Sequence, residues 1–114
     1  MKIYHNNQCS KSNASLKLLT EKGIDLETIE YLKIPLEKAE LKSILAKLNI
    51  PAKDLIRKGE SAFKENYMGK TLSEEEWIEA ILSHPILLQR PIIVKGDKAV
   101  IGRPIEKVME LLKD

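Results

Sequence analysis

The sequence contains a single cysteine, Cys9, within the stretch HNNQCSKSN. Polar residues flank it on both sides, which disfavours the alternative that it is a small core residue. A strand is expected over residues 2–5 and a helix from Ser10 or Ser12, so Cys9 falls at a strand-to-helix turn. The unpaired N–H groups at a helix N-terminus stabilise a thiolate and bind oxyanions. The stretch therefore offers a nucleophile and an anion cradle together.

His5 precedes this cysteine by four positions. A charged imidazole near the thiol would lower its pKa further. The alternative is an ordinary histidine at the end of a strand. The segment from Cys9 to Ser12 also has the form C-x-x-S, a weak signal for redox chemistry by itself. A lone cysteine excludes an intrachain disulfide and a cysteine-rich zinc cluster.

The arginines of the chain are Arg57, Arg90 and Arg103, and the last two each precede a proline. A guanidinium fork matches the oxygens of an oxyanion with two parallel hydrogen bonds, which a lysine cannot do. Taken singly, each arginine is more often a solvated surface residue. Gathered around a thiolate, they would suit a multiply charged tetrahedral substrate.

Hydrophobic periodicity predicts the elements that hold these residues. The first helix ends before Gly23, and residues 26–32 alternate as a second strand, which gives a β-α-β unit with parallel strands. Residues 91–101 predict an antiparallel hairpin. Pro104 suits the first position of a last helix. Without the segment between these two parts, the order is the thioredoxin arrangement.

The middle of the chain is expected to be helical. An amphipathic helix begins near Leu36, and a capping box over Ser73–Glu76 begins another that runs to about His84. Residues 52–61 are ambiguous between a short helix and a loop, and residues 64–71 are polar and loop-like. We therefore expect one α/β domain over residues 1–114, a thioredoxin-like mixed sheet (βαβ then ββα) with a helical insert at about 36–84.

Composition limits the function classes. The chain has 114 residues, 43% hydrophobic and 32% charged, with a net charge of +2. These values indicate a globular protein and disfavour a dedicated nucleic-acid binder. The sequence has neither a signal peptide nor an apolar run of the ~18 residues that would span a membrane. We expect a cytoplasmic monomer in a reducing compartment, where a lone thiol stays reduced.

Four segments resemble the glutaredoxin-coupled arsenate reductases in the family's order: IYHNNQCSKSN, LIRKGE, HPILLQRPIIV and GRPIEKV. The resemblance runs from the first strand to the last helix and implies a thioredoxin-like fold with a helical insert. It implies a nucleophile at Cys9, a histidine near the thiol at His5 and a serine that bonds the thiolate at Ser12. It also implies a cis-proline facing the site and anion-binding arginines, namely Pro91, Arg57, Arg90 and Arg103.

The activity that this resemblance implies is reduction of arsenate to arsenite through a covalent cysteine–arsenate intermediate. Two electrons require two thiols, and the chain supplies one, so the second must come from another molecule. The resemblance names glutathione as co-substrate and glutaredoxin as partner, with no metal or bound cofactor. Two alternatives stay open. One is a glutathione-linked thiol oxidoreductase with a different substrate, and the other is a non-enzymatic regulator that binds RNA polymerase.

Overall fold

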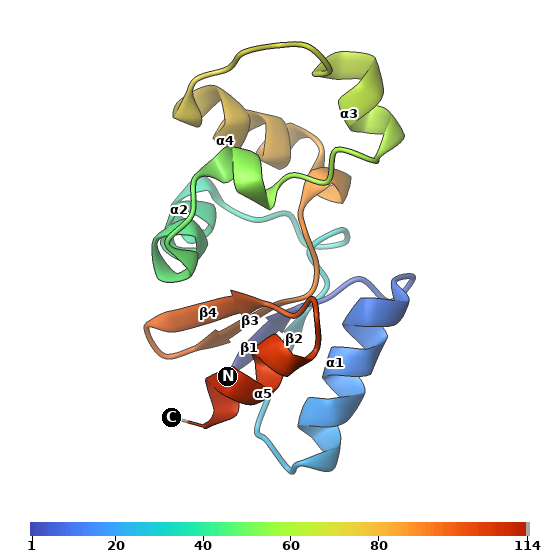
Figure 1. Cartoon of the computed structure of the whole chain (residues 1–114), viewed down its shortest axis with the longest axis vertical. Helices are drawn as coiled ribbons and strands as arrows, with labels where there is room; N and C mark the ends of the chain where they lie inside the picture. The colour runs from blue at the N-terminus through green and yellow to red at the C-terminus, as the bar shows by residue number, and fades with distance from the viewer. Residues whose placement is uncertain (114) are drawn as a thin grey trace. The chain divides into compact units, whose positions relative to one another are not determined.

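The computed structural model describes residues 1–113, and the chain divides into two compact units. One unit joins Met1–Ile34 to the chain from Arg90 onward, and the other is Pro35–Gln89. Figure 1 labels the helices and strands of both units along the chain. The second unit contains the segment 36–84 that the sequence predicts as an insert. The expectation of a single domain stays a prediction.

The first unit is built on a four-stranded sheet in the order β2-β1-β3-β4. Its strands are β1 (Lys2–Tyr4), β2 (Glu27–Ile29), β3 (Ile92–Lys95) and β4 (Lys98–Ile101). β1 pairs with β2 in parallel and with β3 antiparallel, and β3 pairs with β4 antiparallel. Its helices are α1 (Ser10–Glu21) and α5 (Glu106–Leu112). This βαβ then ββα order confirms the predicted thioredoxin-like fold class.

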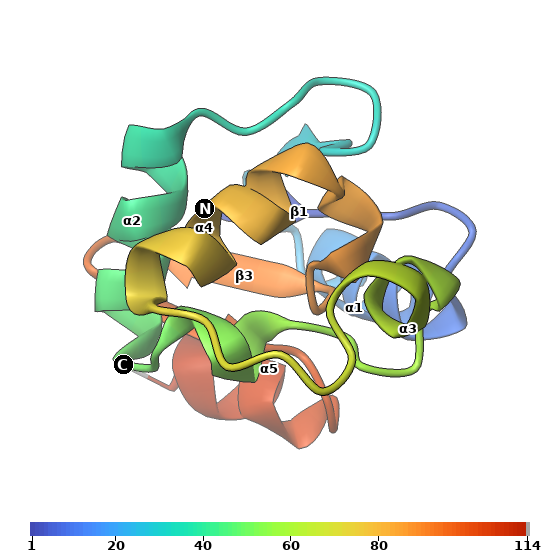
Figure 2. The same cartoon turned by 90° about the horizontal axis from the view of Figure 1, so that it is seen from above.

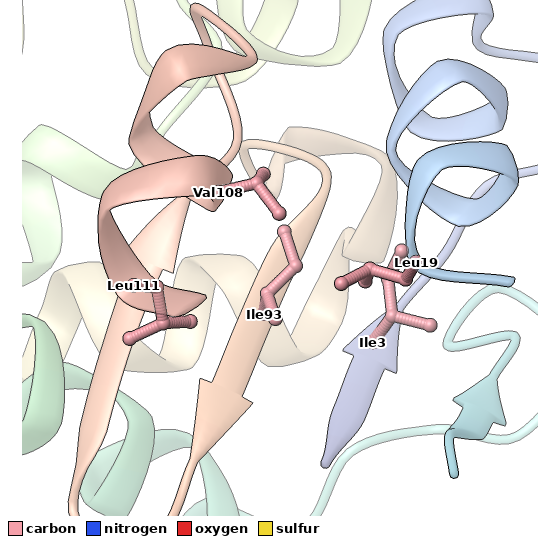
Figure 3. Close-up of a cluster of buried hydrophobic side chains, with 5 residues drawn as sticks. All are labelled: Ile3, Leu19, Ile93, Val108 and Leu111. Carbon is pink, nitrogen blue, oxygen red and sulfur yellow. The ribbon is translucent and has the colours of Figure 1, made fainter. Parts of the chain in front are cut away.

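The two helices of this unit cover the same face of the sheet. Ile3 of β1 lies directly opposite Ile93 of β3, so both side chains point to one face. Leu19 of α1 lies beside Ile3 on this face, and Val108 and Leu111 of α5 lie around Ile93 (Figure 3). All five side chains are buried. This cluster fixes α1 on the sheet and with it the strand-to-helix turn at its start.

Some boundaries in this unit differ from the sequence-based prediction. The second strand covers Glu27–Ile29 and not residues 26–32, because the chain turns after it, with Glu30 O accepting the N–H of Lys33 at 2.9 Å. The last helix begins at Glu106 and not at Pro104. Pro104 lies instead in the turn before the helix, where its carbonyl accepts the N–H of Lys107 at 3.0 Å.

The second unit is helical. Its elements are α2 (Lys38–Leu48), η1 (Ala52–Leu55), α3 (Ser61–Asn66), α4 (Glu74–Ser83) and η2 (Pro85–Leu87). α4 packs against α2 and η1 (Figure 2). Leu41 and Ile44 of α2 are buried, as are Ile78 and Ile81 of α4. Apolar faces at helical spacing therefore form a core of this unit, as the periodicity predicted.

Helix α3 was not predicted, because residues 64–71 were expected to be a loop. An aromatic residue lies directly before this polar stretch and packs inside the unit. Phe63 is buried and stacks on Trp77, with ring centroids 6.3 Å apart. Tyr67 packs beside the same tryptophan with centroids 6.1 Å apart. Tertiary packing of these aromatic rings thus stabilises a short helix that local propensity does not favour.

The predicted capping box at the start of α4 gives a stability test. Ser73 Oγ accepts the N–H of Glu76 at 3.2 Å, and Glu76 Oε1 accepts the N–H of Ser73 at 2.9 Å. Ser73→Ala should lower the free energy of unfolding by about 1 kcal/mol, because the N–H of Glu76 loses its acceptor. Urea denaturation measures this. Ser43→Ala, at an exposed site inside α2, is the control and should not destabilise the chain. Equal losses in both variants would contradict the prediction.

Candidate functional site

Cys9 occupies the N-cap position of α1. Its backbone is extended, with φ −107° and ψ 121°, and its carbonyl accepts the N–H of Asn13 at 3.0 Å. The residue is only 9% exposed, and the first turn of the helix contains no acidic residue. Leu19, near the other end of α1, is buried in the cluster on the sheet, and this packing holds the helix in place. The thiol therefore lies at the positive end of a fixed helix dipole.

The surroundings of this thiol favour the thiolate. Burial raises the pKa of Cys9, but other contacts outweigh it. The backbone N–H groups of Ser12 and Lys11 and the side chain of Arg90 donate hydrogen bonds to the sulfur, and the charge of Arg103 adds to their effect. Together they hold the pKa of the Cys9 thiol below its usual value. A low thiol pKa is the condition for a reactive cysteine.

This direction of shift predicts a pH-dependent stability. The pKa of Cys9 is lowered on folding, so the thiolate contributes stability above the pKa of the unfolded thiol, about 8.5. That contribution is lost as the pH falls through the lower pKa of the folded state. The stability advantage of the wild type over Cys9→Ser should therefore be larger at pH 9 than at pH 6. Parallel urea titrations at both pH values measure it, and an advantage that shrinks with rising pH would contradict it.

Arg103 and Arg90 meet at the thiol. Arg103 Nη2 donates to Cys9 Sγ at 3.1 Å, and Arg103 Nε donates to the carbonyl of Arg90 at 2.6 Å. Arg90 is 7% exposed. The two arginines come together because they flank paired strands. Ile92 of β3 lies opposite Ile101 of β4, so the residues just outside this pair are neighbours. Hairpin pairing thus places two guanidinium groups beside the helix N-terminus.

The prolines after these arginines are both in cis peptide bonds, Arg90–Pro91 and Arg103–Pro104. The family resemblance implied a cis-proline only at Pro91. Gly102 N–H donates to the carbonyl of Pro91 at 2.9 Å. A Cβ on Gly102 would lie 2.9 Å from both Pro91 Cγ and Ser15 Oγ, so only glycine allows this close packing. The contact joins the end of β4 to the start of β3 and to α1.

His5 and Ser12, which flank the turn that carries Cys9, bond each other. His5 Nδ1 is 2.6 Å from Ser12 Oγ, and both residues are buried. Burial lowers the pKa of His5, and the charge of Glu30 only partly opposes this. A lowered pKa favours the neutral imidazole, so of the two alternatives for His5 it supports the histidine without a charge; the role of His5 at the site stays a prediction. Ser12 reaches the thiolate through its backbone N–H, while its hydroxyl bonds His5 and the Asn6 N–H.

The sequence of the chain matches the model of the ArsC family over residues 4–111. The chain belongs to the ArsC family. It is 40% identical to an arsenate reductase of Neisseria meningitidis serogroup B over 98% of this chain and 97% of the relative. It is 44% identical to the uncharacterized protein YfgD of Escherichia coli K12 over 98% of this chain and 96% of the relative.

Solved structures agree with this membership in the ArsC family. An arsenate reductase from Vibrio cholerae superposes with a TM-score of 0.90 at 38% identity, covering 96% of this chain and 97% of that one. A protein described as a putative arsenate reductase from Yersinia pestis gives 0.89 at 38% identity, with the same two coverages of 96% and 97%. The family resemblance drawn from the four sequence segments is confirmed, and so is the thioredoxin-like fold class.

In this ArsC-family chain, the third predicted arginine belongs to the second unit. Arg57 follows η1, and its N–H donates to the carbonyl of Leu87 at 2.7 Å. Its Nη1 lies 3.7 Å from Glu60 Oε1. The structure thus shows how Arg57 is held within its own unit. Its assignment as the third anion-binding arginine stays a prediction.

Two residues of the site were missed by sequence reasoning. Asn6 is 5% exposed and bonds the chain on both sides of Cys9, and Gly102 packs on Pro91. The signal for Gly102 was its place directly before an Arg-Pro pair. The signal for Asn6 was an asparagine three residues before the cysteine of a predicted strand-to-helix turn, since asparagine is a usual first residue of a turn.

Within residues 1–113, no group of three or more His, Cys, Asp or Glu side chains is arranged to hold a metal ion. The same part of the chain has no helix that is long and apolar enough to cross a membrane. The site in the first unit brings together one thiol, two guanidinium groups and backbone N–H groups.

Proposed function

We propose that this protein reduces arsenate to arsenite, with Cys9 as the nucleophile. The observation that carries the proposal is the 3.1 Å hydrogen bond from Arg103 Nη2 to Cys9 Sγ at the N-terminus of α1. Thiolate and anion-binding donors thus share one place, which suits attack on a small oxyanion. Relatives named arsenate reductase, at 40% and 43% identity over nearly the whole chain, support arsenate as the oxyanion.

The first step is capture of the arsenate. The Cys9 thiolate attacks arsenic, an S–As bond forms, and one As–O bond breaks, its oxygen leaving as water with protons from solvent. The remaining oxygens carry negative charge and accept hydrogen bonds from Arg90, Arg103 and the first-turn N–H groups of α1. Arg57 stays the predicted third anion-binding arginine. The product is a covalent cysteine–arsenate intermediate.

The second step is the reduction. Arsenic takes two electrons, and the chain contains only one thiol, so a glutathione thiol supplies the second sulfur. Arsenite is released as Cys9 and glutathione become joined in a mixed disulfide. Per turnover, one arsenate and two thiols give one arsenite, one disulfide and one water. Glutaredoxin then reduces the mixed disulfide and restores the Cys9 thiol. A cytoplasmic location, where such thiols are kept reduced, stays a prediction.

A coupled assay tests this function. Arsenate-dependent NADPH consumption is measured with glutathione, glutaredoxin and glutathione reductase present, and each component is omitted in turn. We expect turnover that needs arsenate and glutathione and that disappears after alkylation of the only thiol. No turnover above that of the alkylated protein would overturn the arsenate assignment. Unchanged turnover without glutaredoxin would overturn only the choice of partner.

A protection experiment separates arsenate from a different substrate. Arsenate bound between Arg90 and Arg103 covers the thiol, so it should slow alkylation of Cys9 by iodoacetamide. Sulfate has the same tetrahedral shape but does not form the thiol adduct that arsenate forms. It therefore serves as the matched anion. We expect arsenate to protect at lower concentrations than sulfate. Equal protection would show a general anion site and would favour a thiol oxidoreductase with another substrate.

Substituting Arg90 tests the clamp. Arg90→Lys keeps the positive charge but loses the planar fork, so binding of a charged oxyanion should weaken by on the order of 1.5–3 kcal/mol, or about 10- to 150-fold. Arsenate-dependent turnover over a range of arsenate concentrations measures this. The alkylation rate with iodoacetamide, an uncharged reagent, reports whether the thiol is still accessible. Arsenate capture within twofold of the wild type would show that Arg90 does not bind the anion.

A further inference from the structure

We propose that Asn6 is a positioning residue for the Cys9 thiol: its side chain closes the turn that carries the cysteine onto the N-terminus of α1. The proposal deepens the proposed function, since it rests on Cys9 as the reacting group. Asn6 does not contact the sulfur in any bond described above. Its effect is exerted through the backbone between residues 6 and 9.

The side chain and the carbonyl of Asn6 both bond the turn. Gln8 N–H donates to Asn6 Oδ1 at 2.9 Å, and Cys9 N–H donates to the carbonyl of Asn6 at 3.0 Å. An asparagine oxygen that accepts from the backbone two residues on forms an Asx turn, which imitates one more turn of backbone. Asn6 is 5% exposed, so water does not readily replace these bonds.

Asn6 is also tied to the elements on both sides. Its N–H donates to Ser12 Oγ at 3.1 Å, and that hydroxyl lies 2.6 Å from His5 Nδ1. The backbone N–H of His5 donates to the carbonyl of Ile29 at the end of β2, at 2.8 Å. The turn is therefore anchored to the first turn of α1 and to the edge of the sheet. Asn6 takes part both in this anchoring, through its bond to Ser12, and in the bonds inside the turn, through Gln8 and Cys9.

The turn sets the direction of the thiol. Cys9 has an extended backbone, with φ −107° and ψ 121°, immediately before α1. In this conformation its sulfur accepts from Arg103 Nη2 at 3.1 Å and from the backbone N–H groups of Ser12 and Lys11. These are directional contacts, and they weaken quickly when the donor and acceptor are misaligned. A looser turn at Gln8 would let the thiol move away from its donors.

The neighbouring asparagine provides a matched control. Asn7 lies in the same turn but is exposed, and its side chain Nδ2 donates to Glu30 Oε1 at 3.3 Å. The backbone carbonyl of Asn7 accepts a hydrogen bond from Asn13 Nδ2. This bond does not depend on the Asn7 side chain. Two amides of equal size thus sit side by side in the sequence, and only one of them bonds the backbone next to Cys9.

The experiment measures the pH dependence of iodoacetamide alkylation in Asn6→Ala, Asn6→Ser and Asn7→Ala. Asn6→Ala should raise the thiol pKa and slow alkylation below that pKa on the order of 3- to 10-fold, as expected for the loss of one net hydrogen bond. Asn6→Ser should recover part of the rate, because a serine hydroxyl forms the same kind of turn more weakly. Asn7→Ala should behave as the wild type. An unchanged pKa in Asn6→Ala, or an equal shift in Asn7→Ala, would overturn the proposal.

Amide hydrogen exchange distinguishes positioning from general destabilisation. In Asn6→Ala, exchange of the Gln8 amide should become faster, while exchange of the buried Leu19, near the C-terminal end of α1, should stay unchanged. Equal acceleration at both amides would overturn the proposal. If Asn6→Ala does not fold, the exchange rate of the Gln8 amide in the wild-type chain still tests the proposal. A Gln8 amide that exchanges as fast as that of a free peptide would overturn the proposal. None of these readouts uses arsenate, so failure of arsenate turnover would leave them intact.

Discussion

Replacing Cys9 by serine is expected to lower arsenate turnover by at least about 1000-fold, because the nucleophile and one of the two required electron donors disappear together. A serine hydroxyl stays protonated at neutral pH and cannot form a disulfide with glutathione. The coupled NADPH assay gives the rate. Mass spectrometry of the protein after incubation with arsenate and glutathione shows whether a glutathione mixed disulfide has formed, which we expect only in the wild type.

The fold should survive this substitution. Serine has nearly the shape of cysteine, and Cys9 lies outside the apolar cluster of the first unit. Circular dichroism and a thermal melt at pH 6, where the thiolate contributes least to stability, serve as the controls for folding. A folded Cys9→Ser protein that kept more than about one hundredth of the wild-type turnover would contradict a mechanism in which this thiol forms the covalent bond.

Arg103→Ala is expected to lower turnover by about 30- to 1000-fold. The substitution removes the charged hydrogen bond to Cys9 Sγ and also the bond that holds the carbonyl of Arg90, at 3.1 and 2.6 Å respectively. Both bonds have a charged donor, and one such bond contributes about 1.5–3 kcal/mol; the bond to the thiolate, with a smaller share from the bond to the carbonyl, makes a loss of roughly 2–4 kcal/mol. The Cys9 pKa should rise at the same time, which iodoacetamide alkylation as a function of pH measures.

Lys107→Ala is the matched control for Arg103→Ala. It changes the net charge of the protein by the same amount, at an exposed position in α5. We expect it to leave both the Cys9 pKa and turnover unchanged, because surface charges far from a reacting group are screened by salt. If Lys107→Ala lowered turnover as much as Arg103→Ala, the effect would come from net charge and not from the contact with the thiol.

Local signals in the sequence were sufficient for much of the first unit. Polar residues around Cys9 and the following helical periodicity placed the cysteine at the start of α1, where the structure has it. The alternation in residues 91–101 predicted the hairpin of β3 and β4. These features depend on residues close together in the chain, so periodicity and turn residues suffice to predict them.

Features that depend on distant residues were not predicted from local signals. The bond between Arg103 and Cys9 joins residues 94 positions apart, and only the pairing of β1, β3 and β4 brings them together. The lowered pKa of His5 also depends on burial by the folded chain, which a local pattern does not report. Helix α3 required the packing of Phe63 on Trp77. In each case the deciding interaction is tertiary.

The bond between Arg103 and Cys9 has a consequence for how the protein is made. The ribosome releases Cys9 long before Arg90 and Arg103, which follow it near the other end of the chain. Until the β3–β4 hairpin joins the sheet, the nascent thiol lacks the contacts with both guanidinium groups that help to lower its pKa. Only the backbone N–H groups of α1 can act on the thiol before then. Activation of the nucleophile coincides with completion of the fold of its own unit.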